Sequence, residues 1–388
     1  MVEHGIDVLR VRGSSPLSRT KNKMITLGIE TSCDETALCI LETQDIGVFG
    51  ESGLKNNLKY KVLANIVHSQ IDLHREYGGV FPILAKREHM KNLPILYEKI
   101  LEDAGIDENR IQQIVVTQGP GLEPALWTGI VFAKELAGKL DIPVIPINHM
   151  EGHIVASLLQ DSKAGTEFKE LKSIKLPVIA VLISGGHTEI VKVEEIGKYE
   201  ILGSTVDDAI GEAFDKVARM LNLPYPGGPE ISRLAEIARK ENLPKSITLP
   251  RPMIHSKNLT FSFSGLKTAV LYTLKSIIDN GHEITYEIKK DIAREFEDSV
   301  TEVLISKTSL ALEENEVHTL IVGGGVIANK HIREAFKNLA NQYSIPLYLP
   351  ETGLTGDNAL MIALAGALSP NTTKARDAGF VAKGNLSL

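Results

Sequence analysis

Two histidines stand four residues apart in the segment His149-Met-Glu-Gly-His153. On a helix this spacing places both imidazoles on one face, where they can share one divalent metal ion. A third ligand must come from elsewhere, and the best candidate is Asp357 in the Thr355-Gly-Asp-Asn358 turn. Two alternatives stay open, because the histidines can be ordinary surface residues and an aspartate at a helix start more often caps the helix. The spacing thus favours a metal site, with His149, His153 and Asp357 as its ligands.

Zinc proteases also use a histidine pair, but their acidic residue stands elsewhere. In His-Glu-x-x-His the glutamate directly follows the first histidine. Here Glu151 stands two positions after His149. At 100° per residue its side chain points to the opposite side of the helix from the imidazoles. Because Glu151 cannot readily act on a metal-bound water, a metalloprotease is a disfavoured interpretation.

Two glycine clusters follow apolar strands, at Ser184-Gly-Gly-His-Thr188 and Gly323-Gly-Gly-Val-Ile-Ala-Asn329. Glycine allows a ligand to approach the backbone closely. Neither cluster is a Rossmann Gly-x-Gly-x-x-Gly or a Walker loop that ends in Lys-Ser or Lys-Thr. A nucleotide would therefore need a site of another kind.

An acidic segment precedes a rigid turn. Its four acidic residues are Asp207, Asp208, Glu212 and Asp215. On a helix the last three would share one face, which is either solvated surface or a place for the ribose hydroxyls of a nucleotide. Tyr225-Pro-Gly-Gly-Pro229 would then close over that nucleotide. Phe261-Ser-Phe-Ser-Gly-Leu-Lys267, with two aromatic residues and a lysine, is either core packing or a substrate loop.

The elements that position these residues alternate between strands and helices. A strand over 24–30, a polar turn over 31–36 and a returning strand over 37–42 begin the pattern, and 177–193 repeats it. Helical periodicity follows each opening, which predicts an α/β protein with two duplicated lobes and a central cleft. The glycine- and hydroxyl-rich turns suit backbone binding of a phosphate, although either could be an ordinary hairpin turn.

The composition is that of a globular protein with more than one domain. The chain has 388 residues, of which 43% are hydrophobic and 23% charged. A net charge of −7 argues mildly against unaided binding of nucleic acid. The two cysteines, Cys33 and Cys39, are too few for a disulfide scaffold, so we expect a reduced, cytoplasmic protein. No apolar run approaches the ~18 residues of a membrane helix, so no membrane partner is expected.

The predicted domains are unequal in length. Residues 1–23 carry five basic and two acidic residues and are expected to form a disordered extension rather than a targeting peptide. Residues 24–150 would form the N-terminal lobe and 151–388 the C-terminal lobe. The final helix, 357–368, would be able to pack back on the first lobe.

Nine motifs occur in order between about Met24 and Ala367. They are Gly28-Ile-Glu-Thr-Ser-Cys-Asp-Glu-Thr36, Gln118-Gly-Pro-Gly121, His149-Met-Glu-Gly-His153, Ser184-Gly-Gly-His-Thr188, Asp207-Asp-Ala-Ile-Gly-Glu-Ala-Phe-Asp-Lys216, Tyr225-Pro-Gly-Gly-Pro229, Phe261-Ser-Phe-Ser-Gly-Leu-Lys-Thr268, Gly323-Gly-Gly-Val-Ile-Ala-Asn329 and Gly356-Asp-Asn-Ala359. Together they resemble the tRNA N6-adenosine threonylcarbamoyltransferase family in its bacterial form, once named O-sialoglycoprotein endopeptidase.

This resemblance implies a two-lobed fold of the actin, Hsp70 and sugar-kinase type. It implies transfer of the threonylcarbamoyl group from threonylcarbamoyl-AMP to N6 of the adenosine 3′ of the anticodon, in tRNAs that read codons beginning with A. It implies one divalent metal, Fe²⁺ or Zn²⁺, on His149, His153 and Asp357, and a catalytic role for Glu35. The residues implied to bind the adenylate, or another adenine nucleotide, are Leu182, Ile183, Ser184, Gly185, Gly186, Asp215, Gly228 and Asn329.

The resemblance also implies protein partners. Bacterial members work on tRNA with an inactive paralogue subunit (TsaB-like) and an ATPase subunit (TsaE-like), which would explain an acidic protein acting on tRNA. Glu123, Pro124 and Trp127 depart from the usual bacterial residues, which puts the partner surface in doubt. Candidates for local positive charge are Arg251, Lys257, Lys267, Lys289, Lys290 and Arg294.

A chaperone or a sugar kinase on the same fold is a further alternative, since fold does not fix function. Neither activity gives a reason for a two-histidine metal site.

Overall fold

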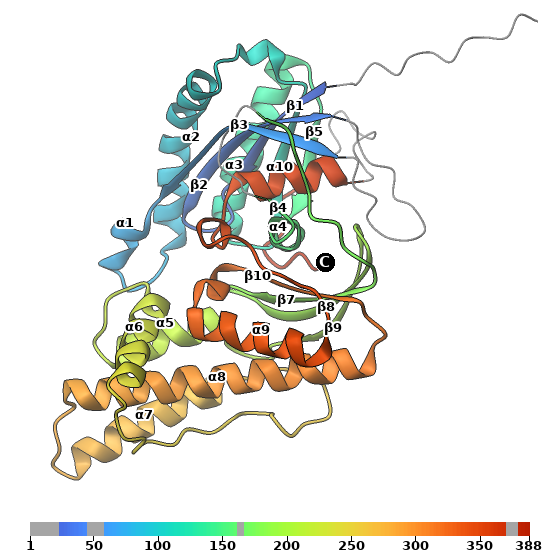
Figure 1. Cartoon of the computed structure of the whole chain (residues 1–388). Helices are drawn as coiled ribbons and strands as arrows, with labels where there is room; N and C mark the ends of the chain where they lie inside the picture. Colours follow the sequence, from blue (N-terminus) through green and yellow to red (C-terminus); the bar gives the residue numbers. More distant parts are fainter. Residues whose placement is uncertain (1–22, 45–57, 161–166, 370–378) are drawn as a thin grey trace, which may run out of the picture.

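The computed structural model describes residues 23–44, 58–160, 167–369 and 379–388. These residues form two sheets, one above the other in Figure 1, with helices on their outer faces and between them. The predicted extension over 1–23 lies outside the described residues except for Lys23, which begins the first strand.

The first sheet has the strand order β5-β4-β1-β2-β3-β6. Its core is the antiparallel hairpin of β1 and β2, with β3 antiparallel to β2 and with β4 parallel to β1. The strands are β1 (Lys23–Glu30), β2 (Glu35–Gln44), β3 (Lys59–Ser69), β4 (Gln113–Gly119), β5 (Val144–Asn148) and β6 (Lys169–Glu170).

The second sheet, in the order β11-β10-β7-β8-β9, repeats the design of the first. The hairpin of β7 and β8 corresponds to that of β1 and β2, with an antiparallel β9 on one side and a parallel β10 on the other. The strands are β7 (Val178–Ile183), β8 (Thr188–Glu195), β9 (Lys198–Ser204), β10 (Thr319–Gly323) and β11 (Leu347–Tyr348). The predicted duplication of two α/β lobes is confirmed.

Helices form layers around the two sheets. The helices are α1 (Ile71–Arg75), α2 (Pro82–Ala104), α3 (Glu123–Leu140), α4 (His149–Ala156), α5 (Ile210–Met220), α6 (Gly227–Lys240), α7 (Ser264–Asp279), α8 (Tyr286–Glu314), α9 (Lys330–Tyr343) and α10 (Ala359–Leu368). Short 3₁₀ turns lie at Glu108–Arg110, Gly325–Ala328 and Thr352–Leu354.

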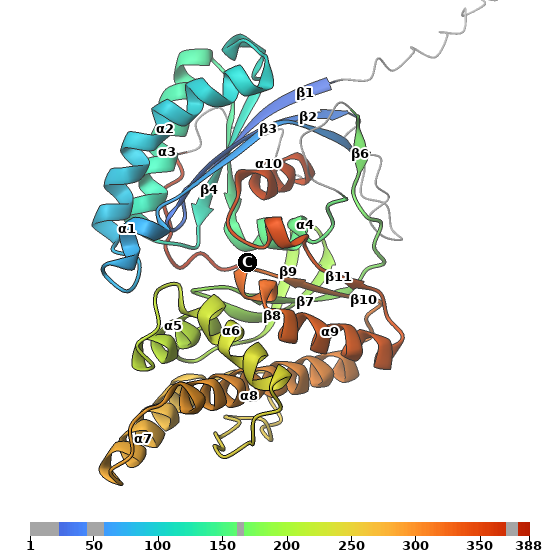
Figure 2. The ribbon, with the colours of Figure 1, turned by 60° about the vertical axis from the view of Figure 1, so that its left-hand side comes forward.

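The order of the layers determines where the histidine pair lies. Helices α2 and α3 cover the outer face of the first sheet, and α5 to α9 lie on the far side of the second (Figures 1 and 2). Between the sheets lie α4 and α10, which contact each other, and α10 also packs on β1, β2 and β4. A buried apolar cluster joins both sheets to these two helices. The helix with the histidine pair is thus held at the centre of the molecule.

The strands predicted over 24–30 and 37–42, their repeat over 177–193 and the final helix over 357–368 are present within a few residues of their expected ends. The predicted boundary between residues 150 and 151 falls inside α4, and the domain limits stay predictions. Edge strands β6, β9 and β11 and the short α1 had no predicted counterpart. Within the described ranges, no helix has both the length and the apolarity needed to cross a membrane.

Candidate metal centre and nucleotide cavity

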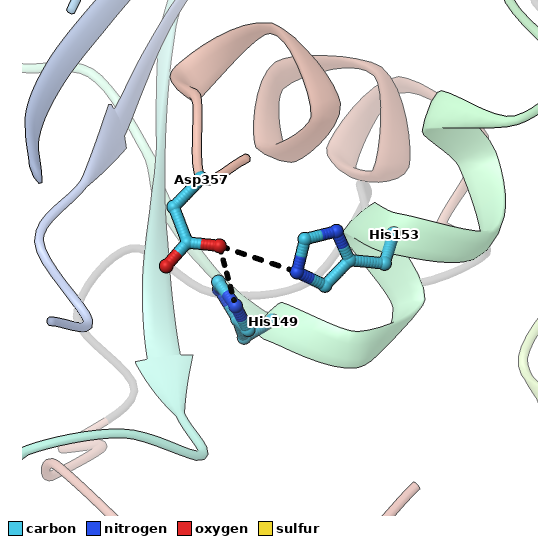
Figure 3. A group of neighbouring side chains, drawn as sticks. All are labelled: His149, His153 and Asp357. Atoms are coloured by element: carbon cyan, nitrogen blue, oxygen red, sulfur yellow. Dashed lines mark ion pairs between the residues drawn. The ribbon is translucent and has the colours of Figure 1, made fainter. Parts of the chain in front are cut away.

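Figure 3 shows that the three predicted metal ligands face one another. His149 and His153 come from successive turns of α4, and Asp357 comes from the segment just before α10. Oδ1 of Asp357 lies 3.3 Å from Nε2 of His149 and 3.2 Å from Nε2 of His153. The ligand atoms all lie within 4.8 Å of one another, so one ion could reach all three.

Local sequence fixes both helix starts. Asn148 ends β5 and caps α4, because its side-chain oxygen accepts a hydrogen bond from Met150 N–H at 2.8 Å. At the other helix the cap is Asn358, which accepts from Met361 N–H at 3.1 Å. Asp357 is therefore not the cap that its position alone suggests, and its carboxylate is free to face the histidines.

Gly152 allows these two helices to approach closely. A Cβ at this position would lie 3.0 Å from both Ile362 Cδ1 and Met361 Cγ. A larger residue would push α10 away from α4 and separate Asp357 from the imidazoles. Packing, as well as the ligands themselves, thus determines the geometry of the centre.

A buried carboxylate orients the first histidine. Glu30, at the end of β1, places Oε2 3.0 Å from His149 Nδ1 and is fully buried. The same carboxylate accepts hydrogen bonds from the Ser32 N–H and the Thr117 hydroxyl. A carboxylate can only accept here, so Nδ1 of His149 donates its proton to Glu30, and Nε2 is the nitrogen that faces Asp357 and would bind a metal.

The donor set fits a bound cation. Nε2 of His153 is buried and makes no well-formed hydrogen bond, although it points at Asp357. Burial acts against ionisation of Asp357 and is the largest influence, yet the two imidazoles outweigh it and hold the pKa of Asp357 far below its usual range. Two imidazole nitrogens and one ionised carboxylate form a ligand set of the kind that zinc and iron accept.

Glu151 takes no part in this centre. Its carboxylate accepts a hydrogen bond from the Tyr199 hydroxyl on β9 at 2.8 Å. The side chain therefore links α4 to the second sheet, as its position in the helix requires, and it does not support a protease mechanism.

The turn between β1 and β2 carries a second acidic group. Glu35 begins β2, and Asp34 precedes it in the turn. Burial, followed by the negative charges of Asp34 and Asp357, raises the pKa of Glu35 well above that of an ordinary glutamate. Burial, and then the charge of Asp34, raises the pKa of Tyr225 in the second lobe. Burial also raises the pKa of Asp215, with a smaller contribution from Asp34, so the turn interacts with residues of both lobes.

A cavity of about 380 Å³ lies in the second lobe. Four of the predicted nucleotide residues line it, namely Gly185, Asp215, Gly228 and Asn329. Of the others, Leu182, Ile183 and Ser184 are buried at the end of β7, and Gly186 is exposed in the following turn. A larger hollow between α8 and α9, about 710 Å³, contains none of the predicted site residues.

Two side chains of the cavity wall are held by the protein itself. Asp215 accepts a hydrogen bond from the Gly227 N–H at 2.7 Å, which ties it to the first turn of α6. Asn329 accepts from the Ile332 N–H at 3.0 Å and donates to Glu297. Both side chains are therefore rigid parts of the wall.

One expectation for the acidic segment, a helix over 208–222 with Asp208 on its acidic face, was wrong at its start. Helix α5 begins at Ile210, so Asp208 stands outside it and pairs instead with Lys216 and Lys267. Asp207 accepts hydrogen bonds from the start of α7.

The aromatic residues of the neighbouring segment are structural. Phe261 and Phe263 are fully buried and stacked. The two aromatic residues therefore pack in the core, which was one of the two alternatives. The rigid turn before Pro229 is also shorter than expected, because α6 already begins at Gly227.

Sequence reasoning missed two residues of the centre. Glu30 was part of a recognised motif, but its contact with His149 joins positions 119 residues apart. His187 stands in the glycine turn of the second lobe, where burial and then the charges of His149 and His153 lower its pKa to about 4. The short Gly-Gly-His stretch was the only signal for it in the sequence.

Solved structures place the fold among two-lobed proteins of the actin, Hsp70 and sugar-kinase class. Full-length HypF, crystallised in a phosphate- and nucleotide-bound form, superposes with a TM-score of 0.52 at 13% identity. The match covers 90% of this chain and 47% of HypF. HypF of T. kodakarensis gives 0.50 at 14% identity, over 92% and 50% of the two chains. At such identities the likeness concerns the fold alone.

Sequence comparison then gives the family. The family model for tRNA N6-adenosine threonylcarbamoyltransferase matches residues 61–364. The enzyme of that name from Paraburkholderia xenovorans is 46% identical over 345 residues, 89% of this chain and 92% of the relative. The one from Thermosipho melanesiensis is 44% identical over 88% and 94%. The chain belongs to the tRNA N6-adenosine threonylcarbamoyltransferase family.

Proposed function

We propose that this chain transfers the threonylcarbamoyl group of threonylcarbamoyl-AMP to N6 of the adenosine 3′ of the anticodon, in tRNAs that read codons beginning with A. The observation that carries the proposal is the meeting of three ligands, His149, His153 and Asp357, near an acidic turn. The second lobe also contains a nucleotide-sized cavity. Family membership supplies the reaction, and the geometry supplies candidate roles for the residues.

The reaction needs alignment more than a strong nucleophile. The donor is a mixed anhydride from which AMP leaves easily, whereas the exocyclic amine of adenosine is a poor nucleophile. Holding the two in contact and stabilising developing charge would therefore provide most of the rate enhancement. No covalent enzyme intermediate is required, and trapping a threonylcarbamoylated side chain would contradict this scheme.

The cavity in the second lobe would hold the adenylate. Asp215 offers a carboxylate to ribose hydroxyls, and Gly185 and Gly228 leave the backbone open for close approach. The fourth residue, Asn329, is fixed by its bond to Glu297 and would contribute shape.

The two histidines and Asp357 would hold one divalent cation, with Fe²⁺ and Zn²⁺ both compatible with the donor set. When bound, the cation supplies Lewis-acid polarisation of a donor oxygen and neutralises phosphate charge. The chain's own contribution is orientation, because Glu30 fixes the His149 ring. Glu35, whose pKa is raised first by burial, would be a stronger proton acceptor for the amine than an ordinary glutamate.

Proton transfer and nucleotide binding can be separated in one assay. The purified chain would be incubated with the adenylate, unmodified tRNA and the partner subunits, and the digested tRNA examined by mass spectrometry for threonylcarbamoyladenosine. We expect Glu35→Gln to lower kcat and Asp215→Asn to raise the KM for the adenylate. Absence of the modified nucleoside with the wild-type chain, where a family enzyme produces it, would contradict the proposal.

Most of the candidate basic residues are not available to RNA. Lys267 pairs with Asp208, and Arg251 pairs with Glu302 and Glu295. Lys290 and Arg294 are also paired. Among the six candidates, the described contacts leave Lys257 and Lys289 without an ion pair. Positive charge for tRNA would therefore come largely from partner subunits.

The helices outside the first sheet would bind the inactive paralogue. They expose large apolar side chains that a soluble protein usually covers. These side chains are Leu73, Tyr77, Phe81, Ile83, Met90, Ile95, Trp127 and Val131. One of them is Trp127, a position at which the resemblance implied a departure from the usual bacterial residues.

A matched pair of variants tests this surface. Met90 on α2 and Ile278 on α7 are both 59% exposed. In size-exclusion chromatography with the paralogue subunit, Met90→Asp should prevent complex formation and Ile278→Asp should not. Equal behaviour of the two variants would show that the paralogue binds elsewhere.

A further inference from the structure

The turn at the start of β2 contains two neighbouring acidic residues that the surrounding protein must hold in position. Asp34 and Glu35 are adjacent, and burial, followed by the charge of Asp34, raises the pKa of Glu35 well above its usual range. Oδ2 of Asp34 is buried and has no hydrogen-bond partner among the described residues. A buried acidic oxygen without a partner is costly, so the turn would tend to move toward water. Something must therefore hold the turn in place.

One histidine holds both ends of this acidic pair. His89, on α2, is fully buried. Its Nε2 lies 3.0 Å from the Cys33 carbonyl oxygen, just before the pair. Its Nδ1 lies 2.8 Å from the Thr36 hydroxyl, just after the pair. The two contacts therefore enclose Asp34 and Glu35 from either side.

These contacts determine the state of the imidazole. A carbonyl oxygen only accepts, so Nε2 of His89 carries a proton and donates it to Cys33. Nδ1 can then accept from the Thr36 hydroxyl, so the neutral ring satisfies both partners. Burial, the largest influence, lowers the pKa of His89 and favours this neutral form. A single tautomer therefore fixes both anchors.

A second layer supports His89 from the side. Gln70 Nε2 lies 3.4 Å from His89 Nδ1, and Gln70 Oε1 lies 3.2 Å from His74 Nε2. His74 in turn accepts from the Phe81 N–H at 3.3 Å. The backbone N–H of Gln70 donates to the carbonyl oxygen of Asp34 at 3.1 Å. The acidic turn is thus attached to α1 and α2 by a continuous buried network.

We propose that His89 is a positioning residue of the transfer reaction, which holds Asp34 and Glu35 at the reacting group through Cys33 and Thr36. The described hydrogen bonds of His89 reach Thr36, Gln70 and Cys33, and none reaches a metal ligand. The inference rests on the role given to Glu35 in the proposed function. A displacement of about 1 Å at such a site can reduce a rate about 100-fold, which sets the size of the expected effect.

Three substitutions at His89 test the two anchors. His89→Leu removes both, so kcat should fall about 100-fold while both KM values change by less than about two-fold. His89→Gln can still donate toward Cys33, and His89→Asn can still accept from Thr36. Each should recover part of the lost kcat, which a role in packing alone would not predict.

Asn92 provides the matched control. It lies on the same helix, is 7% exposed, and its Nδ2 has no partner among the described residues. Asn92→Leu alters the interior of α2 to a similar extent without touching the turn, so kcat should be retained. Zinc affinity, measured by competition with a chromogenic chelator, should be unchanged in all these variants.

The outcomes separate this inference from the proposed function. Wild-type kcat in folded His89→Leu, or an equal loss in Asn92→Leu, would overturn the positioning role. A parallel loss of zinc affinity would assign the effect to the metal centre and would also overturn it. If His89→Leu does not fold, the kcat values of His89→Gln and His89→Asn test the positioning role instead. Full activity of Glu35→Gln would instead contradict the role of Glu35 itself.

Discussion

Substitution of Glu30 by glutamine should weaken metal binding without removing a ligand. The carboxylate of Glu30 is fully buried and accepts from three donors, those of His149, Ser32 and Thr117. A glutamine has the same shape but only one acceptor oxygen, so its NH₂ group must face one set of these donors.

Either orientation of that amide is unfavourable. With its oxygen toward His149, the NH₂ group meets the Ser32 N–H, and a buried donor loses its partner at a cost of about 1–3 kcal/mol. With its oxygen toward Ser32, the NH₂ group faces Nδ1 of His149 and favours a proton on Nε2, the nitrogen that faces Asp357. Loss of such an outer partner typically lowers metal affinity about 10–100-fold, which corresponds to about 1.4–2.8 kcal/mol.

Zinc affinity would be measured by chelator competition at pH 7. Glu151→Gln is the control, because the amide oxygen can still accept from Tyr199 and the residue faces away from the histidines. We expect Glu30→Gln to lose about 10–100-fold in affinity and Glu151→Gln to be unchanged. Wild-type affinity in Glu30→Gln would refute the orienting role, and equal losses in both variants would assign the effect to displacement of α4.

Three further predictions concern stability and the position of α4. Asp207→Ala removes the acceptor for the Phe263 and Ser264 N–H groups and should cost about 1 kcal/mol in urea unfolding, as for a lost helix cap. Burial tends to raise the pKa of Asp207, but hydrogen bonds from Ser262 and Ser264 outweigh it and lower the pKa below 3.8. The difference in stability between wild type and Asp207→Ala should therefore persist above pH 3.8 and vanish as the pH falls through the pKa of the folded state. Asn148→Ser keeps an oxygen that can cap α4 but loses the amide that donates to the Ser387 carbonyl oxygen at 3.1 Å, so zinc affinity should fall. Ser387→Ala keeps that carbonyl oxygen and should leave zinc affinity unchanged. Arg239→Leu leaves the buried Glu297 without its cation and should destabilise the chain by about 3 kcal/mol in thermal or urea unfolding; a loss below about 1 kcal/mol would show that the pair contributes little.

Much of the fold could be predicted because its signals are local. The buried strands carry continuous apolar runs, and most long helices show apolar spacing on one side. The edge strand β9 was missed because most of its residues are half-buried or exposed and its alternation is weak. The start of α5 was misplaced because its first N–H, on Ile210, is bound by the Thr188 hydroxyl, which comes from another strand. A tertiary cap of this kind leaves no mark in the local sequence.

The candidate site likewise contains features that are local in the sequence and features that depend on distant contacts. The histidine pair is a local pattern, and α4 displays it as the helical spacing requires. Asp357 could be suggested but not separated from a cap, because the choice depends on the side chain of Asn358. The contacts of Glu30 with His149 and of His89 with Thr36 join residues far apart in the chain. Only the packing of β1, α2 and α4 brings these groups together.

The central claim is that the His-His-Asp centre supports threonylcarbamoyl transfer to tRNA. Its most direct test is the incorporation of labelled threonine into unmodified tRNA, with the adenylate-forming enzyme and the partner subunits held constant. Wild type should label the anticodon loop, and His149→Ala and Asp357→Ala should not, although both remain folded by circular dichroism. Labelling by both variants at the wild-type rate would contradict the role of the centre, and no labelling by wild type, where a family enzyme succeeds, would contradict the reaction itself.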